Sequence, residues 1–115
     1  MKEKRDYELI VAVVNTGHDD IVMQAAKSAG ARGGTLLHAR ATGVSEAQKF
    51  LGITVQPERD VLLLLVEGAR RNDVMRAVCA VAGINTPAHG VLFSLPVDEA
   101  AGLTPQNFDL PKGEE

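Results

Sequence analysis

Apolar positions divide this chain into two halves with the same internal order. In each half, a run of apolar and β-branched residues is followed by a helical pattern that ends at a glycine, and then by a second apolar run. The pattern therefore predicts strand, helix and strand, twice over. The six predicted elements lie at 9–14, 19–29, 35–40, 61–66, 73–82 and 91–97.

A doubled strand–helix–strand unit predicts an α+β fold, a ferredoxin-like βαββαβ sandwich. Its four strands form one antiparallel sheet, and its two helices lie on one face of that sheet. The runs 9–14 and 61–66 are apolar at every position, which is typical of central strands buried on both faces. The helices cover only one face, so we expect a homo-oligomer that covers the other.

Capping residues indicate where the helices begin and end. Asp19 or Asp20 is expected to cap the first helix, and Asn72 is expected to cap the second. Gly30 and Gly83 follow the last periodic residues, where glycine commonly ends a helix. These positions bound two helices of about three turns each.

The segment 42–56 interrupts the strand pattern between the two halves. Ser45 and Gln48 have the spacing of a capping box, so we expect a loop with one helical turn. Pro96 places the end of the last strand at a sheet edge or terminus. The domain is predicted to span 1–103, and the prolines and charges that follow predict a loosely held tail at 104–115.

Composition narrows the class of protein. A chain of 115 residues forms one domain, and its net charge of −3 without a basic cluster argues against a nucleic-acid partner. The longest apolar run is far too short to cross a membrane. A single cysteine suits a reducing compartment, so a cytoplasmic location is expected.

Cysteine and histidine provide little sign of catalysis or metal binding. Cys79 lies beyond the first turn of the second predicted helix, so we expect a packed core thiol rather than a reactive one. His18, His38 and His89 are far apart and lack metal-ligand spacing. No metal site and no catalytic residue is predicted.

Two arginines flank the 42–56 loop. Arg40 ends the strand before the loop, and Arg59 precedes the strand after it. If these strands pair as a hairpin, both guanidinium groups sit at one mouth and can bind an anion. The alternative is that both are solvated charges at strand ends.

Two segments resemble a known family of regulators. The segments 30–35 (GARGGT) and 89–100 (HGVLFSLPVDEA), in the same order of elements, are similar to the PII nitrogen-regulatory signal-transduction family. The resemblance covers about residues 7 to 103. It implies ferredoxin-like trimers that bind adenine nucleotides in clefts between subunits. It also implies a long loop after the second strand that docks on transporters, enzymes or transcription factors.

Individual family positions can be carried over to this sequence. Thr35 matches a threonine near the adenine, and Gly43 matches a glycine at the base of the long loop. Arg59 stands near a phosphate-binding lysine, while His89 and Gly90 fall on the loop that wraps phosphates. With the arginine before the loop included, the candidate ligand site comprises Thr35, Arg40, Gly43, Arg59, His89 and Gly90.

The chain departs from the family where phosphates are held. The lysine of the phosphate loop is missing from 88–91, and no arginine pair follows the last strand. A ligand with less charge than ATP, such as AMP, ADP or another metabolite, would need fewer bases. The 42–56 loop holds no tyrosine, which excludes the uridylylation of some members.

The sequence therefore predicts a regulatory protein and no enzyme. As a homotrimer, it would sense a small molecule, possible ligands being AMP, ADP and ATP, and would regulate a membrane transporter or metabolic enzyme through the 42–56 loop. One alternative is a trimeric metal-binding protein like the CutA family, which shares the fold. Another is a small α+β-barrel enzyme, which needs an acid–base pair in an enclosed pocket.

Overall fold

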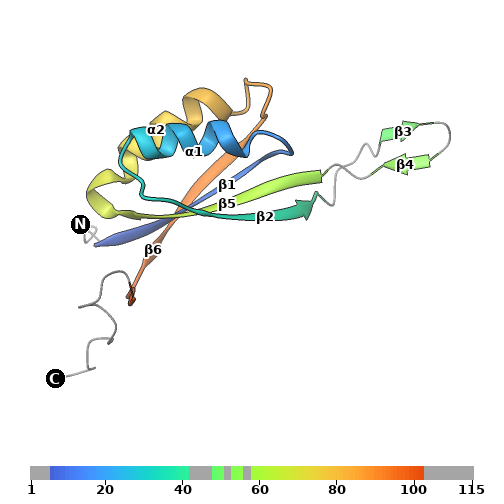
Figure 1. Ribbon diagram of the computed structural model, residues 1–115. Helices are drawn as coiled ribbons and strands as arrows, with labels where there is room; N and C mark the ends of the chain where they lie inside the picture. The colour runs from blue at the N-terminus through green and yellow to red at the C-terminus, as the bar shows by residue number, and fades with distance from the viewer. Residues whose placement is uncertain (1–5, 42–47, 51–52, 56–57, 103–115) are drawn as a thin grey trace.

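A computed structural model describes residues 6–41, 48–50, 53–55 and 58–102 of the chain. Figure 1 shows a layer of two helices over one sheet, with a separate hairpin beyond the end of that sheet. The elements in chain order are β1 (Tyr7–Asn15), α1 (Asp19–Ser28), β2 (Thr35–Arg40), β3 (Gln48–Phe50), β4 (Ile53–Val55), β5 (Glu58–Glu67), the 3₁₀ turn η1 (Gly68–Arg70), α2 (Arg71–Ala82) and β6 (Val91–Val97).

Four strands form the main sheet in the order β2-β5-β1-β6, and every neighbouring pair is antiparallel. Both helices lie on the same face of this sheet (Figure 1). The predicted α+β fold with a four-stranded antiparallel sheet and two helices is thus confirmed. The two most apolar runs form the central strands β1 and β5, and the strand that contains Pro96 is at an edge.

The helix-covered face of the sheet forms the core. Alternate residues of β1 and β5 point towards the helices, because successive side chains of a strand point to opposite faces. Apolar residues from both strands and both helices pack there, at most 7% exposed. The cluster comprises Ile10, Ala12, Val14, Val22, Ala26, Ala31, Leu62, Leu64, Val66, Val74, Val78, Ala82 and Ala88.

The opposite face, which we call the open face, is also apolar. The pairing register places Leu9, Val11 and Val13 of β1 beside residues of β5 and β6 that point the same way. No helix of the described chain covers this side (Figure 1). The large apolar residues that it exposes include Leu37 at 47%, Val91 at 55%, Phe93 at 45% and Leu95 at 48%.

The predicted helix stops are confirmed, but both predicted N-caps are wrong. Gly30 has a φ of +118°, which favours glycine, directly after the C-cap of α1. Gly83 follows the last residue of α2. Asn72 does not cap α2, because η1 leads directly into a helix that begins at Arg71. His18 takes the N-cap position of α1, so Asp19 stands in the first turn.

The prediction of a buried thiol is wrong. Cys79 is exposed, because the buried face of α2 carries Val74, Val78 and Ala82. A residue directly after Val78 is rotated about 100° around the helix from it, away from the centre of that face. Ile21 of α1, directly before the buried Val22, is likewise exposed, at 41%.

The segment after β2 also departs from expectation. Gln48 begins a short strand, β3, that pairs with β4 in a hairpin, so this residue does not continue a helical turn. Ser45 and the tail at 104–115 lie outside the described residues. None of the helices in the described part of the chain is both long and apolar enough to span a membrane.

Candidate functional site

Asn15 connects three segments at one end of the sheet. It is the last residue of β1 and the register partner of Arg59, which donates a hydrogen bond from Nη1 to the Asn15 side-chain oxygen. The Asn15 amide group donates from Nδ2 to the carbonyl of Pro87 at 3.0 Å. Its backbone N–H donates to the carbonyl of Ala88 at 2.8 Å. The 83–90 loop is therefore tied to the strand that follows the 42–56 segment.

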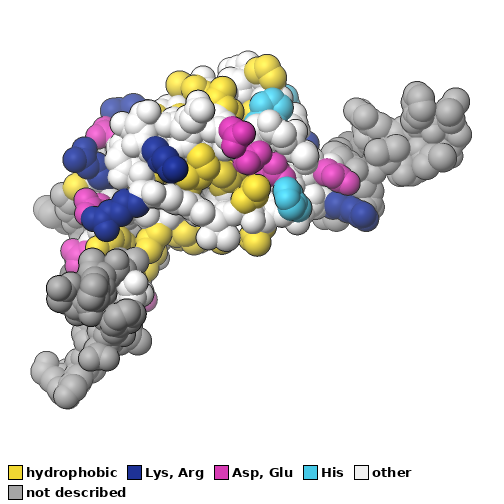
Figure 2. Space-filling view, viewed as in Figure 1, with side chains coloured by type: hydrophobic (Ala, Val, Ile, Leu, Met, Phe, Trp, Pro, Cys, Tyr) yellow, Lys and Arg dark blue, Asp and Glu magenta, His cyan; other side chains and the backbone are white. Residues whose placement is uncertain are grey.

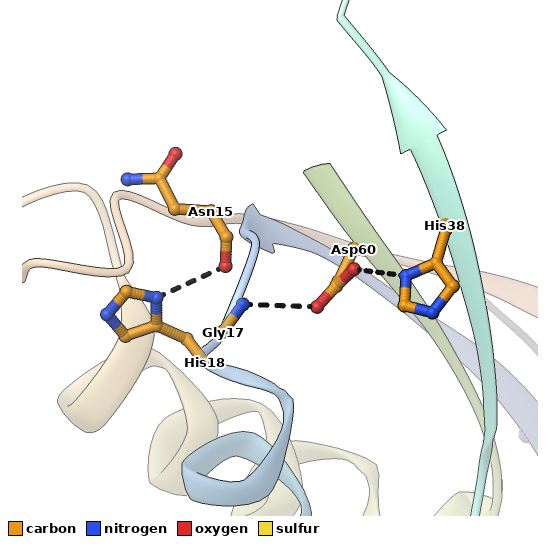
Figure 3. Close-up of polar contacts among 5 residues, drawn as sticks. All are labelled: Asn15, Gly17, His18, His38 and Asp60. Atoms are coloured by element: carbon orange, nitrogen blue, oxygen red, sulfur yellow. Dashed lines mark hydrogen bonds and ion pairs between the residues drawn. The ribbon is translucent and has the colours of Figure 1, made fainter. Parts of the chain in front are cut away.

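A buried carboxylate lies in the same region. Asp60 of β5 is only 1% exposed and has a hydrogen bond at each oxygen (Figure 3). His38 Nδ1 lies 2.8 Å from Oδ1, and the N–H of Gly17 donates to Oδ2 at 3.3 Å. An ionised carboxylate only accepts, so His38 donates in this pair. These contacts hold β2 and the turn after β1 against β5.

His18 completes the polar cluster. Its Nδ1 lies 3.1 Å from the Asn15 carbonyl and donates to it, since a carbonyl oxygen only accepts (Figure 3). The ring thus closes the turn between β1 and α1. Asp60 joins segments far apart in sequence through its hydrogen bonds to Gly17 and His38, while the bond between His18 and Asn15 is local to the turn.

Packing explains why residue 90 of the candidate site is a glycine. Gly90 is buried, and a Cβ there would lie 2.2 Å from the carbonyl oxygen of Ala82 and 2.8 Å from a methyl of Val14. Its N–H donates to the same Ala82 carbonyl at 2.8 Å. The N–H of His89 donates to Thr86 at 2.9 Å. Both amides of the expected phosphate loop are thus engaged within the protein.

The two candidate arginines lie on neighbouring strands, as the hairpin interpretation predicts. Arg40 pairs with Glu58, and Arg59 pairs with Ala39. Because adjacent register positions point to opposite faces, the two guanidinium groups leave the sheet on different sides. Arg59 shares a face with its partner Asn15.

Thr35 lies at the other end of β2. It is five residues from Arg40, about 16 Å along an extended strand. Within one chain it is therefore apart from Arg59 and the 83–90 loop. Gly43 lies outside the described residues.

Sequence reasoning missed the two residues that organise this end of the sheet. Asn15 and Asp60 lie directly outside the predicted strands 9–14 and 61–66, and neither was a candidate. One sequence signal could have indicated the contact between Asp60 and His38. Asp60 stands directly before the apolar run 61–66, and His38 lies on the strand expected to pair with that run. The contact itself depends on the register His38↔Asp60.

Neither a group of metal ligands in the described part of the chain nor a similarity to known proteins indicates what this site binds. Within the described ranges, no three or more His, Cys, Asp or Glu side chains are grouped as metal ligands. Neither the models of known protein families nor the curated proteins contain a match for this chain.

Proposed function

We propose that this chain is a PII-like signal-transduction protein, which senses a small molecule and regulates a transporter or an enzyme by docking on it. The ligand binds at the end of the sheet where β1 ends and β5 begins. The segment 42–56 joins β2 to β5 at this end, and in this proposal it carries the docking surface. The protein acts by binding and is not an enzyme.

The hydrogen bonds of Asn15 are the observation that supports this proposal most directly. The Asn15 side chain contacts the 83–90 loop through Pro87 and the start of β5 through Arg59. A ligand that moves the 83–90 loop would shift Asn15. Asn15 would in turn shift Arg59, which lies shortly after the docking segment 42–56. Such coupling needs a ligand with different affinities for the two arrangements.

Backbone geometry favours a ligand of modest charge. The amides of His89 and Gly90 are already used, so the loop offers the exposed His89 side chain in place of free N–H groups. Arg59 is connected to this loop through Asn15, to which its guanidinium group donates a hydrogen bond. AMP and ADP carry fewer phosphate groups than ATP, so they need fewer of the hydrogen-bond donors and cations that are scarce here.

The proposed assembly is a homotrimer of ferredoxin-like subunits, with ligands in the clefts between them. The order β2-β5-β1-β6, with both helices on one face, supports the ferredoxin-like assignment. The apolar open face supports self-association, since monomers rarely leave so large an apolar surface in water. The number of subunits comes from the family resemblance alone.

The test combines a nucleotide screen with proteolysis of the docking segment. Calorimetry and thermal unfolding with AMP, ADP and ATP should identify at least one nucleotide that binds and raises Tm, because a ligand of the native state stabilises it. The same nucleotide should change the rate of proteolytic cleavage within 42–56. In Asn15→Ala, this change in cleavage should be lost.

Asn72→Ala is the matched control, because Asn72 is exposed on the first turn of α2, away from the 83–90 loop. It should keep the wild-type cleavage response. The proposal is wrong if no nucleotide or common anion binds and cleavage never changes. If the nucleotide still changes cleavage within 42–56 in Asn15→Ala, the proposed coupling through Asn15 is wrong.

A further inference from the structure

The opposite end of the sheet contains a pocket that the proposed function does not use. It encloses about 380 Å³, within the range of sites that hold small metabolites. It lies where β5 ends, close to the C-terminal end of α1 and to η1. Its lining residues are Tyr7, Gly30, Arg32, Gly33, Leu65, Val66, Glu67 and Arg70.

The pocket exists because β2 begins late. Thr35, the first residue of β2, pairs with Leu63, so the last residues of β5 extend beyond their neighbour. Gly34 passes close to β5, where a Cβ would lie 2.5 Å from a methyl of Leu64. Gly33, by contrast, has open space at its Cβ position. The chain thus leaves the edge of β5 uncovered beside the pocket.

Positive charge exceeds negative charge in the lining. Arg32 and Arg70 contribute two cations, and Glu67 contributes one carboxylate. Arg32 lies 3.7 Å from Glu67, with the side chains 77% and 52% exposed, so the pair is weak and solvent-screened. Figure 2 shows several Lys and Arg side chains at this end of the molecule, with acidic side chains between them.

Arg70 is the more available of the two cations. Among the described residues it makes no hydrogen bond or ion pair. Its aliphatic stem lies over Gly30, where a Cβ would be 3.0 Å from Arg70 Cδ. Glycine at this position, which also has a positive φ, leaves room for the arginine to lie along the pocket wall.

The remaining lining is suited to an apolar body. Leu65 and Val66 belong to β5, and Tyr7 stands opposite Glu67 on β1. We infer that this pocket binds a small organic anion, with its carboxylate or phosphate at Arg70 and Arg32 and its apolar part against Tyr7 and Leu65. A guanidinium group binds either kind of oxyanion through two parallel hydrogen bonds.

The experiment uses three probes of one shape and the full-length chain. Benzoate and phenyl phosphate carry the two head groups, and benzamide is the neutral control. Titrations followed by amide chemical shifts should give saturable binding of at least one anion, with a Kd of about 1 mM, ordinary for so small a molecule. The largest shifts should fall at residues 30–33 and 65–70.

Three variants locate the site. Arg70→Gln should weaken binding about tenfold, because it removes a charged hydrogen-bond donor. Arg76→Gln is the matched control, since Arg76 is exposed on α2, the helix that follows η1, and does not line the pocket. Gly33→Leu should fill the space and abolish binding, while circular dichroism reports whether the fold is kept.

Each outcome supports or overturns the inference. Benzoate-only or phosphate-only binding identifies the head group, whereas equal binding of benzamide overturns the role of charge. No saturable binding of either anion overturns the site, as do equal losses in Arg70→Gln and Arg76→Gln. Because no probe is a nucleotide, failure here leaves the proposed nucleotide site unaffected, and success does not support it.

Discussion

The two faces of the sheet have similar composition and opposite surroundings. Leu62 and Leu64 point to the helices and are at most 1% exposed, while Leu63 and Leu65, between and beside them, point to the open face and are half-buried. The same strand thus supplies a packed core on one side and an apolar surface on the other. Apolar composition identifies a buried strand, but it does not say what buries each face.

Removing a large side chain from each face compares them most directly. Leu64→Ala should lower the free energy of unfolding by about 2–5 kcal/mol, because the cavity is enclosed by helices. Leu63→Ala is the matched change one residue away, and in the monomer it should cost clearly less. Chemical denaturation of both variants at low protein concentration measures the difference. Equal losses would mean that the open face is packed as tightly as the core.

Gly90 closes the covered layer between β1 and the end of α2. Gly90→Ala should lower the free energy of unfolding by about 3 kcal/mol, because the new methyl overlaps a backbone oxygen that cannot move aside. Gly33→Ala is the control, because its Cβ would meet no atom within 4 Å. Thermal unfolding compares the two. Similar Tm values in both variants would contradict the packing role of Gly90.

Among the residues that the structure describes, Asp60 is the buried charged side chain. Asp60→Ala should destabilise the fold by about 2 kcal/mol, because it leaves the Gly17 N–H and the His38 ring without their acceptor. Glu58→Ala, two residues earlier and exposed, should change stability far less. Urea unfolding at neutral pH separates them. If both variants unfold alike, the buried carboxylate contributes nothing to holding the strands together.

The open face is expected to matter for assembly more than for the stability of one chain. Phe93→Ser should change monomer stability by less than about 1 kcal/mol, since the ring is 45% exposed, yet it should reduce the molecular mass in solution. Ile84→Ser, at a similarly exposed residue outside the sheet, is the control. Light scattering coupled to size-exclusion chromatography measures both. A wild-type chain that is already monomeric would exclude self-association through this face.

Most of the secondary structure was predictable because local signals were strong. The strands Thr35–Arg40 and Val91–Val97 lie where the apolar pattern predicts them, and Gly30 ends α1. Several local predictions failed, and two of them show the physical reason clearly. The start of α2 depends on a 3₁₀ turn that has no capping side chain, and Cys79 is adjacent to the buried stripe rather than within it.

The candidate site was less predictable. Arg59 and the 83–90 loop are connected by Asn15, which forms a hydrogen bond with each of them. The position of Asn15 depends on the register between β1 and β5. Thr35 was grouped with them, and within one chain it lies at the far end of its strand. The order of residues in the sequence does not show which of them lie at the same end of the sheet.

By itself, the sequence determined the order of the two helices and the four strands of the main sheet, the glycines that end the helices, and the apolar character of both central strands. These properties depend on neighbours within a few residues of the chain. The tertiary structure decided which face the helices cover and that Asp60 is buried against His38 and Gly17. It also placed a pocket beside Arg70, beyond the start of β2. These features arise from pairing between segments distant in sequence, where register and packing decide which side chains meet.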